Sequence, residues 1–448
     1  MTPLSRQHCA MQKHLILAAT ASALFLTIPA SAQSDATSPE RMRALVEQLV
    51  SFGTRHTLSS ADDPARGIGA ARRWGASEFE SYSQACGGCL EITTISDTFT
   101  GERAPDGVVV EDVLAIQRGA GDPGRVIIIQ GHIDSRVTDP MDFTSDAPGA
   151  NDDGSGTALV IEAARILSRE QHDATIVYAL LSGEEQGLWG GTLLARHAVE
   201  QGWQVAAVLN NDIVGNTLGS SGEIVDDRVR VFSEGIRSSE DLEAQMARRG
   251  NGGEADGPSR ALARLAQRVG EANPQLGLEV FRVGRPDRFR RGGDHIPMLA
   301  QGFPAVRFTV GAENYDHQHQ DLRTEDGVFF GDTVDYMDFP YLARVTALNI
   351  AVAREVADAP PPPASVTIEG AVSPDTTIAW EPVAGAARYR IHWRRNDRSD
   401  WQHHYDVMGD TTFTLENVVI DDHFFGVSTI AENGAESLVT FGGGPARR

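Results

Sequence analysis

Acidic and histidine side chains collect in five short segments that follow, or lie just beyond, runs of apolar residues. The apolar runs have the length and composition of buried strands. In an open α/β sheet the binding site lies outside the carboxyl ends of the strands, so we expect the five segments to meet at one edge. They are residues 131–135, 149–156, 182–187, 210–212 and 313–321.

The residue types in these segments suit a pair of zinc ions, because imidazole nitrogens and carboxylate oxygens are zinc ligands. Two metals about 3.5–4 Å apart can share a bridging carboxylate and a bridging water. His132 and Asp134 are two residues apart at a strand end, so both side chains lie on one face. Asp134 can then accept a hydrogen bond from the imidazole and fix which nitrogen faces the metal. Glu184 and Glu185 point apart, so that one can bind a metal while the other accepts a proton.

Each motif by itself has a common structural explanation. A strand-end histidine beside a carboxylate is frequent, residues 152–156 could cap a helix, and Glu184 with Glu185 could form a solvated turn. The combination of five motifs, their order and their placement after strands favours a function.

Strands and helices alternate before residue 359. Strands that are apolar throughout are typical of a parallel sheet covered by helices on both faces. We therefore predict an α/β fold with a mostly parallel mixed sheet flanked by helices. The predicted strands are residues 125–130, 174–181, 205–210 and 303–310, with an amphipathic helix at 157–169 and leading helices at 38–58 and 67–83. Segment 215–258, rich in glycine and charge, is expected to fold over the strand ends and shape a side-chain pocket.

Four consecutive prolines, residues 360–363, form a stiff linker between two regions. Beyond the linker (359–364), alternating strands are predicted at 366–368, 377–380, 389–393, 412–415 and 425–430. Their spacing predicts a small all-β sandwich over residues 365–448. With Trp380, Tyr389 and Trp393 it resembles a fibronectin type III domain, which could contact a surface or polymer or pack on the first region.

The charge balance and the amino terminus restrict the function further. The chain has 39 basic and 62 acidic residues, and this acidity argues against nucleic acid as a partner. Residues 1–32 have the layout of a secretory signal peptide: Arg6 and Lys13, an apolar run at 15–28, and small residues before Gln33. We therefore expect export to the periplasm or the medium, with no later segment able to span a membrane.

Lys13 is the only lysine in the sequence. A mature chain without lysine excludes Schiff-base enzymes, lysine-containing phosphate loops and protein kinases. Two cysteines remain after cleavage, Cys86 and Cys89, and an oxidising compartment favours a disulfide between them.

Residues 40–358 resemble peptidase family M28, zinc exopeptidases of the bacterial aminopeptidase type. The resemblance rests on segments 131–134, 149–156, 183–187 and 211–215, which follow the order of the family, and on segment 294–297 ahead of the last ligand. It implies a chain with two zinc ions that hydrolyses the amino-terminal bond of peptide substrates. Asp152 would bridge the zinc ions and be joined to Asp153 by a non-proline cis peptide. His132 and Asp212 would complete one site, and Glu185 with a late histidine the other.

The resemblance also implies that Glu184 is the general base, with Asp134 beside His132 in the catalytic set. For the last metal ligand we expect His319, with His317 as the alternative. Asp294 has two open interpretations, because it could orient a ligand or substrate, or cap the helix that starts after it.

Two other functions compete with this one. A glutaminyl-cyclase-like acyl transferase would use a single zinc, and the five ligand positions argue against it. An inactive peptidase domain kept for binding is disfavoured by Glu184 beside a complete ligand set. A serine hydrolase is disfavoured because no Gly-x-Ser-x-Gly segment follows a predicted strand.

Overall fold

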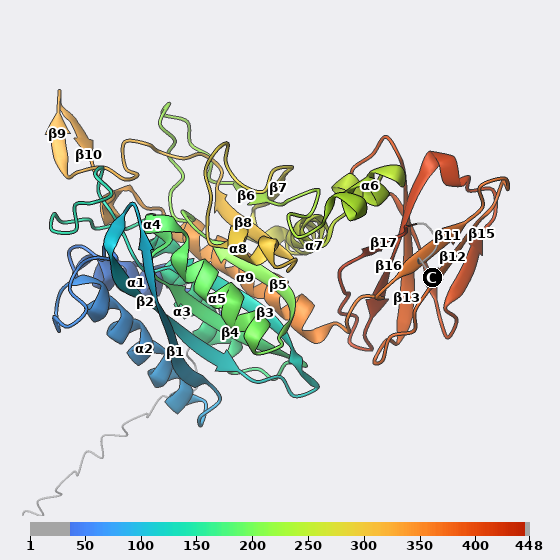
Figure 1. Cartoon of the computed structure of the whole chain (residues 1–448), viewed down its shortest axis with the longest axis horizontal. Coiled ribbons are helices and arrows are strands. Elements are labelled where there is room, and N and C mark those ends of the chain that lie inside the picture. The colour runs from blue at the N-terminus through green and yellow to red at the C-terminus, as the bar shows by residue number, and fades with distance from the viewer. Residues whose placement is uncertain (1–35, 444–448) are drawn as a thin grey trace, which may run out of the picture. The chain divides into compact units, whose positions relative to one another are not determined.

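The computed structural model describes residues 36–443. The predicted signal peptide therefore lies outside the described residues. In Figure 1 helices cover a large sheet, and a smaller all-β region follows at the carboxyl-terminal end of the sequence. The predicted fold class, a mixed sheet flanked by helices, is confirmed.

The large sheet has eight strands in the order β1-β2-β4-β3-β5-β8-β6-β7. The central strands β4, β3, β5 and β8 run parallel, and antiparallel pairings attach β2 on one side and β6 on the other. The strands are β1 (Glu91–Gly101), β2 (Ala104–Gln117), β3 (Asp122–His132), β4 (Ala174–Leu181), β5 (Gln204–Asn211), β6 (Arg228–Phe232), β7 (Glu279–Val283) and β8 (Ala305–Val310). The four predicted strands correspond to β3, β4, β5 and β8, whereas β1, β2, β6 and β7 were not predicted.

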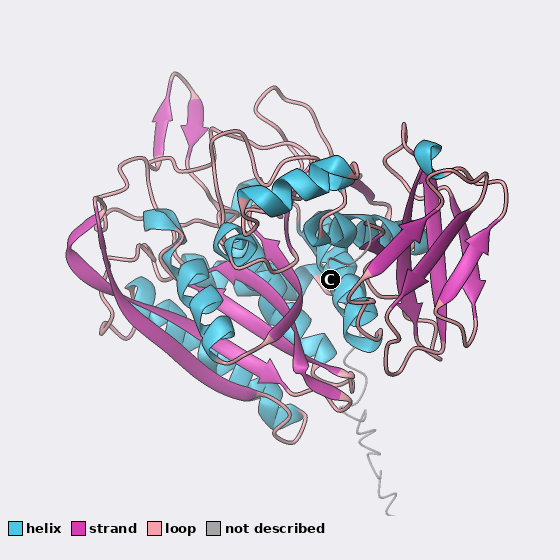
Figure 2. Cartoon of the chain, turned by 45° about the vertical axis from the view of Figure 1, so that its right-hand side comes forward, coloured by secondary structure: helices cyan, strands magenta, loops and turns pink. Residues whose placement is uncertain are grey.

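Helices cover both faces of this sheet (Figure 2). Ile127 and Ile129 of β3 pack with α1, α2, α3, α7 and α9 on one face, while Val126 and Ile128 pack with α5 and α8 on the other. The helices are α1 (Pro39–Val50), α2 (Gly67–Ala85), α3 (Gly154–Leu167), α4 (Glu184–Gly187), α5 (Trp189–Glu200), α6 (Leu242–Gly250), α7 (Pro258–Ala272), α8 (His295–Ala300) and α9 (Phe339–Asp358). Burial on both faces explains why the central strands carry no alternating pattern.

Three details of the prediction were wrong. The leading helix ends at Val50, not at residue 58, because Gly53 takes a positive φ of 75° and the chain turns inward. There the buried Arg55 donates hydrogen bonds to the carbonyl oxygens of Ile133, Pro148 and Gly149. Helix α3 is buried at every position and so has no solvated face. Segment 215–258 contributes the sheet strand β6 and helix α6, and only its first few residues line a pocket near the strand ends.

The remaining strands form two antiparallel sheets and a small hairpin. One sheet has the order β11-β12-β15 and the other β14-β13-β16-β17, with Trp380 packed on Tyr389 at 5.3 Å between ring centres. The strands are β11 (Val366–Glu369), β12 (Thr376–Trp380), β13 (Arg388–Arg395), β14 (His403–Val407), β15 (Thr412–Leu415), β16 (His423–Ile430) and β17 (Thr440–Phe441), and the hairpin is β9 (Arg323–Glu325) with β10 (Val328–Phe330). All five predicted strands are present, whereas β14 and β17 were missed. The domain boundaries and the fibronectin type III resemblance stay predictions.

Short 3-10 helices complete the secondary structure at η1 (Gly253–Ala255), η2 (Pro274–Leu276), η3 (Val334–Tyr336) and η4 (Ile420–Asp422). Cys86 and Cys89 form the predicted disulfide just after α2. Within residues 36–443, no helix is both long enough and apolar enough to cross a membrane.

A set of ion pairs, here called the interface network, connects the β-sandwich to the region around α7. Asp256 contacts Arg394 of β13 at 2.8 Å and Arg264 of α7 at 2.9 Å. Glu436 contacts His392 at 3.0 Å and Arg268 at 3.6 Å. The network consists of Asp256, Arg264, Arg268, Arg390, His392, Arg394 and Glu436. Asp256 and Arg394 are each only 2% exposed, so this contact is buried.

Candidate metal centre

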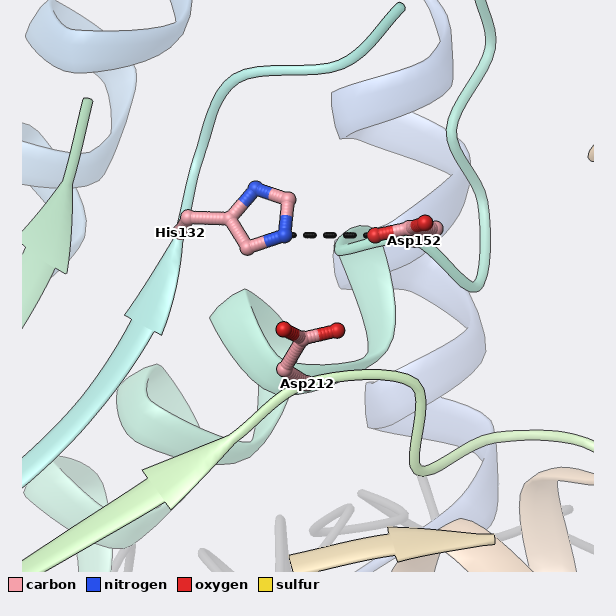
Figure 3. Close-up of side chains that lie close together, drawn as sticks. All are labelled: His132, Asp152 and Asp212. Carbon is pink, nitrogen blue, oxygen red and sulfur yellow. Dashed lines mark ion pairs between the residues drawn. The ribbon is translucent and has the colours of Figure 1, made fainter. Parts of the chain in front are cut away.

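The predicted site residues come from the carboxyl ends of the parallel strands and the loops beyond them. His132 ends β3, Asp152 precedes α3, Glu185 lies in α4 after β4, and Asp212 follows β5. His319 lies in the loop after β8. Figure 3 shows His132, Asp152 and Asp212 converging from separate elements, with the ion pair between His132 and Asp152 drawn. The fold therefore brings together all five residues predicted as metal ligands.

Potential ligand atoms gather in three overlapping groups, in each of which the atoms lie within 4.8 Å of one another. One group is His132, Asp152 and Asp212, and another is Asp152, Glu185 and His319. These two groups match the predicted ligand sets and share Asp152. The third group combines His132 with Glu184 and Glu185.

The two oxygens of Asp152 face different histidines. Oδ1 lies 3.2 Å from Nε2 of His132, and Oδ2 lies 2.8 Å from Nε2 of His319. Nε2 of His319 is also 2.9 Å from Oε1 of Glu185. A carboxylate that presents one oxygen to each of two ligand groups has the arrangement required of a bridging ligand.

Unpartnered polar atoms indicate that these residues fit a metal. Nε2 of His132 and Oε1 of Glu185 are buried and have no well-aligned hydrogen bond among the described residues, although carboxylates or imidazoles lie near them. Buried polar atoms without hydrogen bonds are costly, and metal coordination is one way to satisfy them. Two imidazoles and three carboxylates are a donor set that zinc accepts.

Hydrogen bonding at the far side of His132 sets its tautomer. Nδ1 lies 3.1 Å from the carbonyl oxygen and 3.5 Å from Oδ1 of Asp134, so the proton belongs on Nδ1 and the lone pair on Nε2. Burial disfavours the charged imidazole, but the nearby carboxylates of Asp134 and Asp152 raise the pKa of His132 well above its usual value. The carboxylates that attract a proton to this place attract a metal cation by the same field.

Asp134 also holds the backbone of the two glutamates. Its carboxylate accepts hydrogen bonds from the backbone N–H groups of Glu184 at 3.3 Å and Glu185 at 3.2 Å, and from Oγ1 of Thr57 at 3.1 Å. Through these contacts, Asp134 positions both His132 and the two glutamates, Glu184 and Glu185.

Asp152 is fixed by its neighbours in sequence and in space. The bond from Asp152 to Asp153 is a cis peptide, as the family resemblance implied. The carboxylate of Asp153 accepts from the N–H groups of His132 and Gly156, while that of Asp332 accepts from the N–H of Asp152 at 2.7 Å. Burial raises the pKa of Asp332 to about 7.

Glu184 borders the pocket beside the ligand groups. Burial raises the pKa of its carboxyl well above the usual value, and the charges of Asp212, Glu185 and Asp294 act in the same direction. A carboxyl group with a raised pKa is a stronger proton acceptor than a solvated carboxyl group.

The two candidate histidines occupy different environments. The ring of His317 stacks on Tyr336 at 3.5 Å between ring centres, and its Nδ1 lies 3.0 Å from the carbonyl oxygen of Gly331. Unlike His319, His317 belongs to none of the ligand groups found among the described residues. The geometry therefore favours His319, which remains a prediction.

Two arginines that the sequence analysis missed neutralise outer oxygens of the ligands. Arg136 donates to Oε2 of Glu185 at 2.8 Å, and Arg307 forms an ion pair with Oδ1 of Asp212 at 2.7 Å. The sequence could have identified Arg307, because a charged residue inside an apolar strand requires a buried partner of opposite charge. Arg136 and Asp332 lie in loops and carried no such signal.

Asp294 does not act as a helix cap through its side chain. It occupies the N-cap position of α8 without a capping hydrogen bond, and Oδ1 instead accepts from the N–H of Gly191 at 3.0 Å. The helix-cap interpretation was therefore wrong. Burial raises the pKa of Asp294 to about 7.

A pocket of about 310 Å³ opens in front of the ligand groups, which form part of its lining together with Glu184. A second pocket of about 360 Å³ also borders Asp152 and is lined by His317 and Gln318. Asp152 therefore borders both pockets.

Comparisons with known proteins agree with the geometry. The profile described as peptidase family M28 matches residues 112–326. The chain is 42% identical over 410 residues to a "probable zinc metalloprotease" of Leptosphaeria maculans, covering 90% of this chain and 94% of that protein. It is also 42% identical over 412 residues to one of Pyricularia oryzae, covering 90% of this chain and 82% of that protein.

Solved structures share the fold. The LapA aminopeptidase of Legionella pneumophila matches with a TM-score of 0.50 and 18% identity, covering 72% of each chain. The glutaminyl cyclase of Fimbriiglobus ruber matches with a TM-score of 0.50 and 17% identity, covering 71% of this chain and 95% of that one. At these identities the similarity extends to the fold alone.

Proposed function

The chain belongs to peptidase family M28, and from that premise we propose that it is an exported aminopeptidase that binds two zinc ions. The observation that carries the proposal is the pair of ligand groups that share Asp152, with Glu184 beside them. His132 and Asp212 would hold one ion, and Glu185 and His319 the other. The signal-peptide pattern of residues 1–32 supports export.

Zinc ions in such a site supply Lewis acidity, which polarises a carbonyl group and lowers the pKa of water. Glu184 accepts a proton from the attacking water and returns it to the leaving amine. Asp134 fixes the ring of His132 and the backbone of Glu184, so that the base stays aligned with the ligands. Asp152, Glu185 and Asp212 are all buried, so that the surrounding protein holds their carboxylates in place beside the pocket.

Metal stoichiometry of the mature chain tests the proposal directly. After gel filtration without chelator, elemental analysis should give two zinc ions per chain, and the loaded protein should release the amino-terminal residue from unblocked peptides but not from acetylated ones. Absence of bound zinc after zinc has been supplied, or cleavage of acetylated peptides at the same rate, would contradict it.

A glutaminyl-cyclase-like activity is the second candidate, because a glutaminyl cyclase shares the fold. It predicts one zinc per chain and cyclisation of peptides that begin with glutamine. Two zinc ions without cyclisation would exclude it.

The last ligand can be identified with two matched variants. His319→Ala should release one zinc ion and abolish turnover, whereas His317→Ala should keep both, because His317 contacts Tyr336 and Gly331 instead of the ligands. The reverse pattern would reassign the ligand to His317. Zinc content and kcat, measured on both variants, separate the two outcomes.

A further inference from the structure

The pocket in front of the candidate metal centre has an arginine-rich wall. Arg103, Arg288 and Arg291 line it together with the acidic ligand residues. The whole chain has a formal charge of −23, so this wall reverses the prevailing sign locally. Charges that line a cleft raise the local concentration of oppositely charged ligands.

Arg103 has little bonding of its own. It lies in the turn between β1 and β2, and its guanidinium makes one hydrogen bond, to the carbonyl oxygen of Glu185. No carboxylate within residues 36–443 forms an ion pair with it. Since a guanidinium has five N–H donors, most of those of Arg103 are free at a half-buried position that borders the pocket.

Arg291 belongs to a group with more cations than carboxylates. Glu313 is shared by Arg230 at 2.7 Å, Arg288 at 3.3 Å and Arg291 at 3.1 Å. Arg288 also donates to Asp287 and to the carbonyl oxygen of Gly292. Arg291 contacts Glu313 and the side chain of Gln318 through Nη1 alone and is 33% exposed.

Neutralising the acidic metal ligands does not account for Arg103 and Arg291. Arg136 and Arg307 already perform that task at Glu185 and Asp212. Among the described contacts, neither Arg103 nor Arg291 touches the side chain of a predicted metal ligand. Their free donors therefore point to an anionic group that enters from outside.

We propose that Arg103 and Arg291 bind a carboxylate of the substrate, so that the enzyme prefers peptides with a carboxylate close to the scissile bond. This inference rests on the proposed aminopeptidase function. Planar guanidinium groups match carboxylates in geometry and can donate two parallel hydrogen bonds. The carboxylate can come from an acidic side chain or from the carboxyl terminus of a short peptide.

Two pairs of substrates distinguish these sources. The first pair is the 4-nitroanilide of glutamate against that of glutamine, and the second is leucyl-leucine against leucyl-leucinamide. One of the two pairs contains the carboxylate that the enzyme recognises. For that pair, kcat/KM of the zinc-loaded wild-type chain should be about 10- to 100-fold higher for the substrate with the carboxylate than for the substrate without it. Added salt should reduce this ratio.

Arg103→Gln and Arg291→Gln should each reduce that preference by about tenfold and leave the rate on the neutral member nearly unchanged. Glutamine at position 103 keeps an N–H donor for the carbonyl oxygen of Glu185, which protects the fold of the turn. Arg290→Gln is the matched control, because it removes an equal charge from an exposed neighbour outside the pocket lining. The Arg290→Gln variant should show the same ratio of kcat/KM values as the wild type.

Failure of this inference is distinguishable from failure of the proposed function. Hydrolysis of neutral substrates without preference for either acidic member, unchanged in both variants, overturns the carboxylate site and leaves the aminopeptidase intact. If no unblocked peptide is cleaved, the aminopeptidase proposal fails. Calorimetric titration of the zinc-loaded chain with glutamate and glutamine then decides, since equal affinity in wild type and Arg103→Gln overturns the carboxylate site as well.

Discussion

Two buried clusters of charged side chains differ in the balance of their charges. The ligand groups at the strand ends contain four carboxylates and two imidazoles. Buried atoms without a well-aligned hydrogen bond occur in both clusters, as at Nε2 of His132 and Oδ1 of Asp256. The interface network has the opposite composition, because its two carboxylates, Asp256 and Glu436, lie among four arginines and one histidine. The first cluster has the composition of a site for an added cation, whereas the second is neutralised by the chain itself.

Burial of charge alone therefore does not indicate function. A buried ion pair with its own partners serves the folded structure, and its net contribution to stability is small compared with the cost of breaking it. A buried group of like charges is destabilising unless something else binds there. Four experiments test this distinction.

The largest effect is expected at Glu184, the proposed general base beside the strand-end cluster. Glu184→Gln should lower kcat by about 10²- to 10⁴-fold, because the amide cannot accept and return the proton. Its zinc content should equal that of the wild type. The exposed Glu200→Gln on α5 is the control, and an active Glu184→Gln variant would remove Glu184 from the role of base.

Removing the carboxylate at the centre of the interface network should affect stability and not chemistry. Asp256→Asn leaves the guanidinium groups of Arg264 and Arg394 buried without their anion, which should cost about 3–5 kcal/mol in the free energy of unfolding. Urea unfolding measures the cost, and kcat of the folded variant should stay at the wild-type value. Unchanged stability would mean that the network is solvated in solution.

Acid should weaken the part of the interface network around Glu436. Burial tends to raise the pKa of Glu436, but hydrogen bonds and charge from His392, together with Arg268 and Ser428, hold it at about 2. Since the unfolded carboxyl has a pKa of about 4.3, the unfolded chain binds the proton first, and stability falls by about 3 kcal/mol as the pH drops from about 4.3 to about 2. Glu436→Gln should flatten this part of the stability curve, measured by urea unfolding. Equal acid sensitivity of variant and wild type would refute the assignment.

The smallest effect is expected at an exposed ion pair. Arg118 and Glu91 lie 2.8 Å apart, but their side chains are 56% and 57% exposed. Arg118→Gln should change the free energy of unfolding by less than about 1 kcal/mol, because solvent screens such pairs. A loss of unfolding free energy as large as that of Asp256→Asn would show that solvent exposure does not decide how much an ion pair contributes to stability.

The strand-end arrangement was predictable because its signals are local. Every residue of β4 is buried, so the apolar run alone locates the strand and the motif that follows it. The hairpin of β1 and β2 was not predicted, because β1 is mostly exposed and rich in threonine. Only pairing with β2, which in turn pairs with β4, makes it a strand of the sheet.

The partners of the site depend on tertiary contacts and were less accessible to sequence reasoning. Asp332 reaches the backbone of Asp152 across 180 positions of sequence. Arg103 borders the site only because the β1–β2 hairpin carries it to Glu185. His317 and His319 share one loop, and the stacking of His317 on Tyr336 that separates them is invisible in the sequence.

The contact between Asp256 and Arg394 has a consequence for the evolution of the chain. The two residues are 138 positions apart, in segments that a boundary at the proline linker would assign to different domains. A mutation of one leaves the other as an unpaired buried charge, so the two positions are expected to covary among related chains. A chimera that combines this peptidase region with the sandwich of a relative should fold well only if both halves of the pair are inherited together.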